Sequence, residues 1–162
     1  MKLSQNLFGT AIDNPFVVAS GKWSWEAKDW RAAEKAGAGA ITTKSFWPRI
    51  HEGNPEPTVV QTEAWTLNAV GLPDHGPEHS GAQIKDYLAT GKTPLFVSIV
   101  GLTPEDIAEN VRRIAPLKPA AFEVNLSSPT FLKLRGSFFD ENAAEEMVAA
   151  ACGEAKDRKS VV

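Results

Sequence analysis

The sequence predicts an α/β protein of the (β/α)8 TIM-barrel family, here as an N-terminal half-barrel of about four βα units with a small antiparallel insertion. Segments rich in β-branched or aromatic residues recur at 15–20, 39–45, 94–100 and 120–128, and a helical pattern follows each, as in parallel βα sheets. Each segment ends in polar residues, and the carboxyl ends of such strands are where α/β enzymes keep their chemistry. The chain has 162 residues, whereas a complete barrel needs about 250, so we expect a truncated or split chain.

The first βα unit is expected to run from a strand at 15–20 into a helix that begins near Ser24. The strand follows Asn-Pro, which is a turn signal. Ser24 can cap the helix, and Glu26 lies favourably at the positive end of its dipole. Gly37 would end the helix and lead into the second strand at 39–45.

A long non-helical insertion at 46–76 separates the second strand from the next helix. Loops of this length in compact domains tend to be functional lids or binding loops. We expect a small antiparallel excursion over the strand ends. The helix near 77–90 then carries Ile84, Tyr87 and Leu88 inward, at helical spacing.

The third strand, at 94–100, precedes the helix with the clearest start signal. Thr103 can cap it, Pro104 occupies the first helical position, and two acidic residues follow in the first turn. Pro116 would end this helix, because proline cannot continue it.

The fourth strand, at 120–128, is expected to lead through a loop at 129–139 into a helix capped by Asp140. That helix has an inner face of alanine, methionine and valine side chains. A fifth strand is expected to begin within 156–162, where the sequence KDRKSVV stands.

Composition excludes several classes of protein. The net charge of −3 gives no basic patch for nucleic acid, and no stretch approaches the roughly 20 apolar residues that span a bilayer. The N-terminus is too polar for a signal peptide, and the single Cys152 excludes an internal disulfide framework. The three histidines have no metal-ligand spacing, so we expect no metal site. A cytoplasmic enzyme that acts on a small molecule fits best.

The strand tips hold the candidate functional residues. Serine and glycine at a strand end are more often turn formers than ligands, so each tip is weak evidence alone. Lys44 is stronger evidence, since burying an unpaired ammonium is costly and it should face an anion or a polar ligand. A further polar cluster, 68–72, lies in the long insertion.

The stretches NPFVVASG, GAGAITTKS, EGNPEP, TLNAVGL and EVNLSSPT resemble the dihydroorotate dehydrogenase family, in that family's order and spacing, over about residues 5–155. The resemblance implies an FMN-containing barrel that oxidises dihydroorotate to orotate in pyrimidine (UMP) biosynthesis. The same motifs recur in the related flavin domain of dihydropyrimidine dehydrogenase.

The resemblance also implies roles for particular residues. The candidate FMN-binding residues are Ala19, Ser20, Gly21, Lys44, Ser45, Ser98 and Asn125. The candidate substrate-binding residues are Lys44, Asn68, Val70, Gly71, Leu72, Asn125 and Thr130. Ser128 matches the catalytic base, which is usually cysteine in soluble class 1 enzymes and serine in membrane-associated class 2 enzymes. A serine hydroxyl needs help from a water relay or from a transition state coupled to hydride departure.

Two departures from the family pattern keep alternatives open. Thr130 stands where an asparagine usually contacts the pyrimidine, which allows a sister FMN oxidoreductase acting on another pyrimidine or cyclic amide. The barrel loops that usually hold the phosphate lie outside this half, so the isolated chain is expected to bind FMN poorly and to have little or no activity. A non-catalytic assembly module, a homodimer through open edges, or a complementary C-terminal half are the resulting possibilities. The electron acceptor stays open among fumarate, NAD and quinone.

Overall fold

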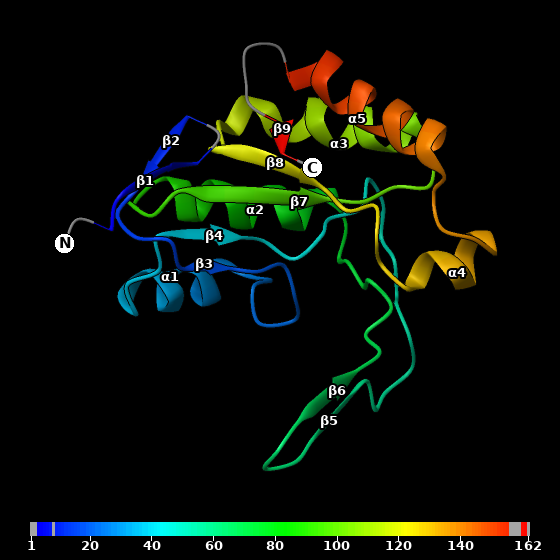
Figure 1. Cartoon of the computed structure of the whole chain (residues 1–162), viewed down its shortest axis with the longest axis horizontal. Helices are drawn as coiled ribbons and strands as arrows, with labels where there is room; N and C mark the ends of the chain where they lie inside the picture. Colours follow the sequence, from blue (N-terminus) through cyan, green and yellow to red (C-terminus); the bar gives the residue numbers. More distant parts are fainter. Residues whose placement is uncertain (1–2, 8, 156–159, 162) are drawn as a thin grey trace.

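The computed structural model describes residues 3–7, 9–155 and 160–161. Among these residues the centre is a five-stranded sheet in the order β3-β4-β7-β8-β9, in which every pairing is parallel. Its strands are Val17–Val18 (β3), Ala40–Thr42 (β4), Leu95–Ile99 (β7), Ala121–Val124 (β8) and Ser160–Val161 (β9). Spatial order follows chain order and helices lie between successive strands (Figure 1), so the predicted partial (β/α)8 barrel is confirmed.

The helices are Ala27–Lys35 (α1), Pro77–Leu88 (α2), Pro104–Ile114 (α3), Thr130–Arg135 (α4) and Glu141–Ala155 (α5), with a 3-10 turn at Ala115–Leu117. Figure 1 shows α3 and α5 side by side on the side of the sheet that carries β8 and β9. The main core lies between sheet and helices and includes Trp30, Ile41, Ile84, Tyr87, Val97, Ile107, Phe122 and Met147. Ile84 and Tyr87 therefore face inward, as their spacing predicts.

Alternation along the strands places a second apolar cluster on the opposite face of the sheet. It contains Ala40, Phe96 and Ala121, and Ile12 covers it. Ile12 belongs to an N-terminal hairpin of Gln5–Leu7 (β1) and Thr10–Ile12 (β2), which lies where the parallel strands begin (Figure 1). Sequence analysis missed this hairpin, because its strands are too short and polar to show a period.

Two predicted helix starts are confirmed. The Thr103 hydroxyl accepts a hydrogen bond from the Asp106 N–H at 3.2 Å, and the Asp140 carboxylate accepts one from the Ala143 N–H at 2.8 Å. Both caps satisfy backbone donors that lack a partner within the helix. The loop between β8 and α5 therefore ends where the sequence predicts.

The predicted cap of α1 is wrong. Glu26 occupies the N-cap position, and the Asp29 carboxylate accepts a hydrogen bond from the Glu26 N–H at 3.0 Å. Ser24 instead donates its hydroxyl to the Thr42 carbonyl, while its own carbonyl accepts the Trp30 indole N–H at 2.9 Å. Ser24 thus ties the first unit to β4, a contact that local sequence cannot reveal.

The segment 129–139, expected to be a loop, contains α4. Phe131 in this helix is fully buried and packs edge-on against Phe139, with ring centres 4.8 Å apart. Its burial beside Trp47 and Val100 supplies the tertiary contact that a six-residue helix needs, since short helices are marginal by themselves.

The long insertion forms the predicted antiparallel excursion. Val59–Gln61 (β5) pairs with Thr66–Asn68 (β6), and the hairpin projects away from the sheet (Figure 1). Among the described residues, no helix has the length and apolar character needed to cross a membrane.

Two glycine substitutions are expected to have opposite effects on stability. A side-chain carbon at Gly39, just before β4, would overlap the Asn14 carbonyl oxygen, so Gly39→Ala should lower the free energy of unfolding by about 2 kcal/mol. Gly153 lies within α5 with no neighbour within 4 Å, so Gly153→Ala should raise it by roughly 0.5–1 kcal/mol. Urea unfolding measures both, and equal midpoints would contradict this account.

Candidate active site

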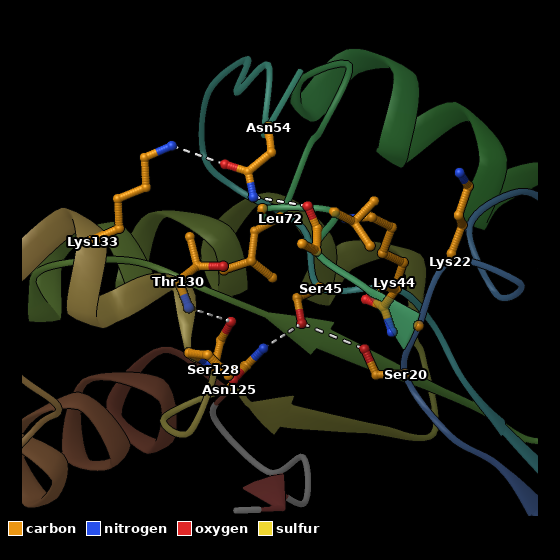
Figure 2. Close-up of a pocket in the computed structure, with 16 residues that line it drawn as sticks. Ser20, Lys22, Lys44, Ser45, Asn54, Leu72, Asn125, Ser128, Thr130 and Lys133 are labelled. Carbon is orange, nitrogen blue, oxygen red and sulfur yellow. Dashed lines mark hydrogen bonds between the residues drawn. The ribbon is translucent and has the colours of Figure 1, made fainter. Parts of the chain in front are cut away.

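A cavity of about 430 Å³ opens at the carboxyl ends of the parallel strands. Figure 2 shows its walls, which come from the tips of β3, β4 and β8, the long insertion and α4. The lining residues are Ser20, Gly21, Lys22, Lys44, Ser45, Asn54, Asn68, Ala69, Val70, Gly71, Leu72, Asn125, Ser128, Pro129, Thr130 and Lys133. The predicted site residues thus meet in one place, apart from Ala19 and Ser98.

Ser45 joins the strand tips through hydrogen bonds. Its hydroxyl accepts from the Asn125 Nδ2 at 2.9 Å and lies 2.9 Å from the Ser98 hydroxyl and 3.4 Å from the Ser20 hydroxyl. Ser98 is fully buried and acts from beneath the cavity by holding Ser45. Ala19 is exposed and is absent from the lining.

Lys44 is a buried cation at the cavity wall, with 4% of its surface exposed. Its ammonium donates to the Pro73 carbonyl at 2.6 Å and lies 4.9 Å from the centre of the Trp25 ring. Burial lowers the pKa of Lys44 to about 8, and the charge of Asp74 opposes that shift. An ammonium has three donors, so this group retains capacity for a ligand.

The segment Asn68–Leu72, hereafter called the substrate loop because the sequence predicts substrate-binding residues in it, is held against Asn54 by two of its carbonyl groups. Asn54 donates its Nδ2 to the Ala69 carbonyl at 2.8 Å and its backbone N–H to the Val70 carbonyl at 3.0 Å. In a planar trans peptide the following N–H points the opposite way. The N–H groups of Val70 and Gly71 therefore face away from Asn54, and neither meets an acceptor within the described part of the chain.

The end of the substrate loop is also held by residues from the start of the long insertion. The Leu72 carbonyl accepts the Trp47 indole N–H at 2.9 Å and lies 3.1 Å from His51 Nδ1. Gly71 and Leu72 have positive φ values of 75° and 55°. Successive backbone N–H groups in a turn can form a concave site that suits anions.

Ser128 lies in the turn between β8 and α4 and is half-buried. Its hydroxyl accepts the Thr130 N–H at 3.3 Å. Among the described residues that line the cavity there is neither a carboxylate nor an imidazole. Ser128 therefore has no carboxylate or imidazole beside it among these lining residues.

Charge in the cavity is of one sign. Lys22, Lys44 and Lys133 line it without a lining carboxylate among the described residues, although the Glu56 carboxylate lies 3.9 Å from the Lys22 ammonium. A concave site of one sign attracts the opposite charge. No group of three potential metal ligands occurs among the residues that the structure describes.

Sequence reasoning assigned no role to Lys22, Asn54 or Lys133. Asn54 lies inside EGNPEP, one of the motifs that carry the family resemblance, so its motif was the available signal. Lys133 reaches the cavity because α4 forms, and no local signal marked it.

Fold and cavity together define part of a (β/α)8 barrel with a cationic site at its strand tips. The family model described as dihydroorotate dehydrogenase matches residues 2–161. The chain belongs to the dihydroorotate dehydrogenase family.

Named relatives agree with this assignment. The chain is 35% identical to dihydroorotate dehydrogenase B (NAD(+)), catalytic subunit, of Pelobacter propionicus, over 99% of this chain and 53% of that protein. It is 35% identical to dihydroorotate dehydrogenase (fumarate) of Trypanosoma cruzi, over 80% of this chain and 42% of that one. The chain thus spans about half the length of the curated relatives it matches.

A solved structure supports the fold. The dihydroorotate dehydrogenase of Eimeria tenella, crystallised with ferulenol, superposes with a TM-score of 0.82 over 96% of this chain and 44% of that one, at 22% identity. At that identity the likeness concerns the barrel fold.

Proposed function

We propose that this chain forms the FMN- and substrate-binding part of an enzyme that oxidises dihydroorotate to orotate in pyrimidine biosynthesis. One observation carries the proposal: the lining of a cationic cavity at the strand tips includes Lys44, Ser128, and Val70 and Gly71 of the substrate loop, whose backbone N–H groups meet no acceptor among the described residues. Dihydroorotate carries a carboxylate, which needs such donors. The ring carbon next to the one that bears this carboxylate must lose a proton.

Substrate recognition follows from the donors. Lys44 and the N–H groups of Val70 and Gly71 would bind the carboxylate and ring carbonyl oxygens, and charge-assisted bonds of this kind are stronger than neutral ones. The side-chain oxygen of Asn125 accepts the Ser127 N–H, and its side-chain nitrogen donates to the Ser45 hydroxyl. These two bonds fix the plane of the Asn125 amide at the cavity wall.

The tips of β3, β4 and β8 have the chemistry to hold a flavin ring. Gly21 lines the cavity and has no atom within 4 Å of the position that a side chain would take, so a planar ring can approach its backbone. Ser20, Ser45 and Asn125 supply polar contacts along the same wall. Bound FMN would supply the hydride acceptor, and the charge of Lys44 would stabilise negative charge that develops beside it.

Ser128 would take the proton. Its oxygen accepts the proton from one substrate carbon while the hydride departs from the neighbouring carbon, and the hydroxyl proton passes to water. The described residues that line the cavity offer no carboxylate or imidazole to assist, which supports a water-mediated step.

The test is an FMN titration of this chain mixed with a complementary C-terminal half of the barrel, followed by anaerobic addition of dihydroorotate. We expect the visible flavin absorbance to bleach and orotate to form in equal amount, and then fumarate or NAD to restore the colour. FMN binding without bleaching would overturn the proposed reaction.

Two further predictions of the sequence concern the whole protein. One is a second copy or a complementary polypeptide at the sheet edges, and the other is a cytoplasmic location.

One residue favours a second candidate function. Thr130 lines the cavity where the family usually has an asparagine, so a sister FMN oxidoreductase could act on a pyrimidine with different ring substituents. Dihydrouracil lacks the carboxylate that Lys44 would bind. Faster flavin reduction by dihydrouracil than by dihydroorotate would favour this second function over the first.

A further inference from the structure

Asn54 binds the substrate loop through both its side chain and its backbone. Its side-chain nitrogen and its backbone N–H hold two successive carbonyl groups, those of Ala69 and Val70. A side-chain carbon at Gly71 would come within 2.7 Å of the Asn54 backbone nitrogen and side-chain carbonyl carbon. The loop backbone therefore lies directly against Asn54, and its conformation depends on that residue.

The remaining polar atom of the Asn54 side chain points to α4. Its Oδ1 accepts a hydrogen bond from the Lys133 ammonium at 2.9 Å (Figure 2). Lys133 lies in the helix that starts at Thr130, two positions after Ser128. This hydrogen bond joins the long insertion to α4 through two side chains.

We propose that Asn54 and Lys133 are positioning residues that couple the substrate loop to the segment carrying Ser128. The inference rests on the proposed function, because that function puts substrate donors on one element and the proton acceptor on the other. Their separation must be held within a fraction of an ångström for efficient reaction. A buried apolar cluster of Trp47, Val100 and Phe131 also joins the two elements, and the Asn54–Lys133 bond adds a polar contact between them.

The bond is exposed, so its loss should spare the fold while loosening the loop. A hydrogen bond to a charged group at the surface stabilises by about 1 kcal/mol, which corresponds to roughly fivefold in a local equilibrium. Local opening of this kind is visible in amide hydrogen exchange, even when global stability does not change.

The first experiment measures hydrogen exchange in the ligand-free chain. We expect Lys133→Met to speed exchange in the peptide spanning 66–73 about fivefold, with β7 unchanged. Lys133→Arg should preserve slow exchange, because it can still donate to Asn54. Lys85→Met removes one exposed lysine from α2 and serves as the matched charge control. Equal exchange in wild type and Lys133→Met would overturn the coupling.

The second experiment is a double-mutant cycle on orotate affinity with Lys133→Met and Asn54→Ala. We expect Lys133→Met to weaken binding about fivefold in the wild-type background and to have no effect once Asn54 is gone. Additive losses would mean that Lys133 acts as a separate charge, against the proposal. If wild type binds no orotate, the proposed function fails, and the exchange experiment still decides whether the two elements are coupled.

Discussion

Replacing Lys44 by methionine is expected to weaken orotate binding by roughly 10- to 150-fold without loss of stability. The ammonium is the buried cation of the cavity, and charge-assisted hydrogen bonds contribute about 1.5–3 kcal/mol. Methionine keeps most of the length of the side chain but carries no charge to desolvate. Calorimetric titration and thermal unfolding measure the two effects. A destabilised variant with unchanged affinity would show that Lys44 is structural.

The same lysine predicts a pH dependence of both quantities. Its pKa of about 8 in the folded chain means that affinity for the carboxylate should fall as pH rises above about 8, by up to tenfold per pH unit. Because that pKa is depressed from 10.5, the unfolded chain binds more protons between these values, and stability should rise with pH across this window. Lys44→Met should abolish both trends, and Lys85→Met should keep them.

Replacing Ser128 by alanine is expected to slow flavin reduction by dihydroorotate by about 10²- to 10⁴-fold, the usual contribution of a positioned acid or base. Orotate affinity should stay within about threefold, because Ser128 is proposed to act on the proton and not on the carboxylate. Rapid-mixing absorbance on the FMN-loaded chain gives the rate. Ser127→Ala is the matched control, since Ser127 is exposed and outside the lining.

Ser128→Cys tests the chemistry of the same position. A thiol has an ordinary pKa near 8.5, far below that of a hydroxyl, so the pH–rate profile of flavin reduction should shift toward lower pH. A profile identical to that of wild type would mean that deprotonation at this position does not limit the rate.

Sequence alone determined the repeated βα pattern, the caps at Thr103 and Asp140, and the clustering of polar residues after the strands. These features are local or periodic: a cap acts three residues away, and successive parallel strands bring their carboxyl ends to one edge of the sheet. The motifs also identified Lys44, Asn125 and Ser128 as members of one site, and the cavity brings these three together.

Tertiary structure alone decided other features. Ser24 binds the Thr42 carbonyl and leaves the cap to Glu26, α4 forms because Phe131 finds a buried place, and Lys133 reaches Asn54 across 79 positions of sequence. Each of these contacts depends on a residue that is distant in the sequence and that reaches its position only when the sheet assembles. Local propensity and periodicity carry no information on such pairs, so the coupling between substrate loop and α4 was visible in the folded chain and not in its sequence.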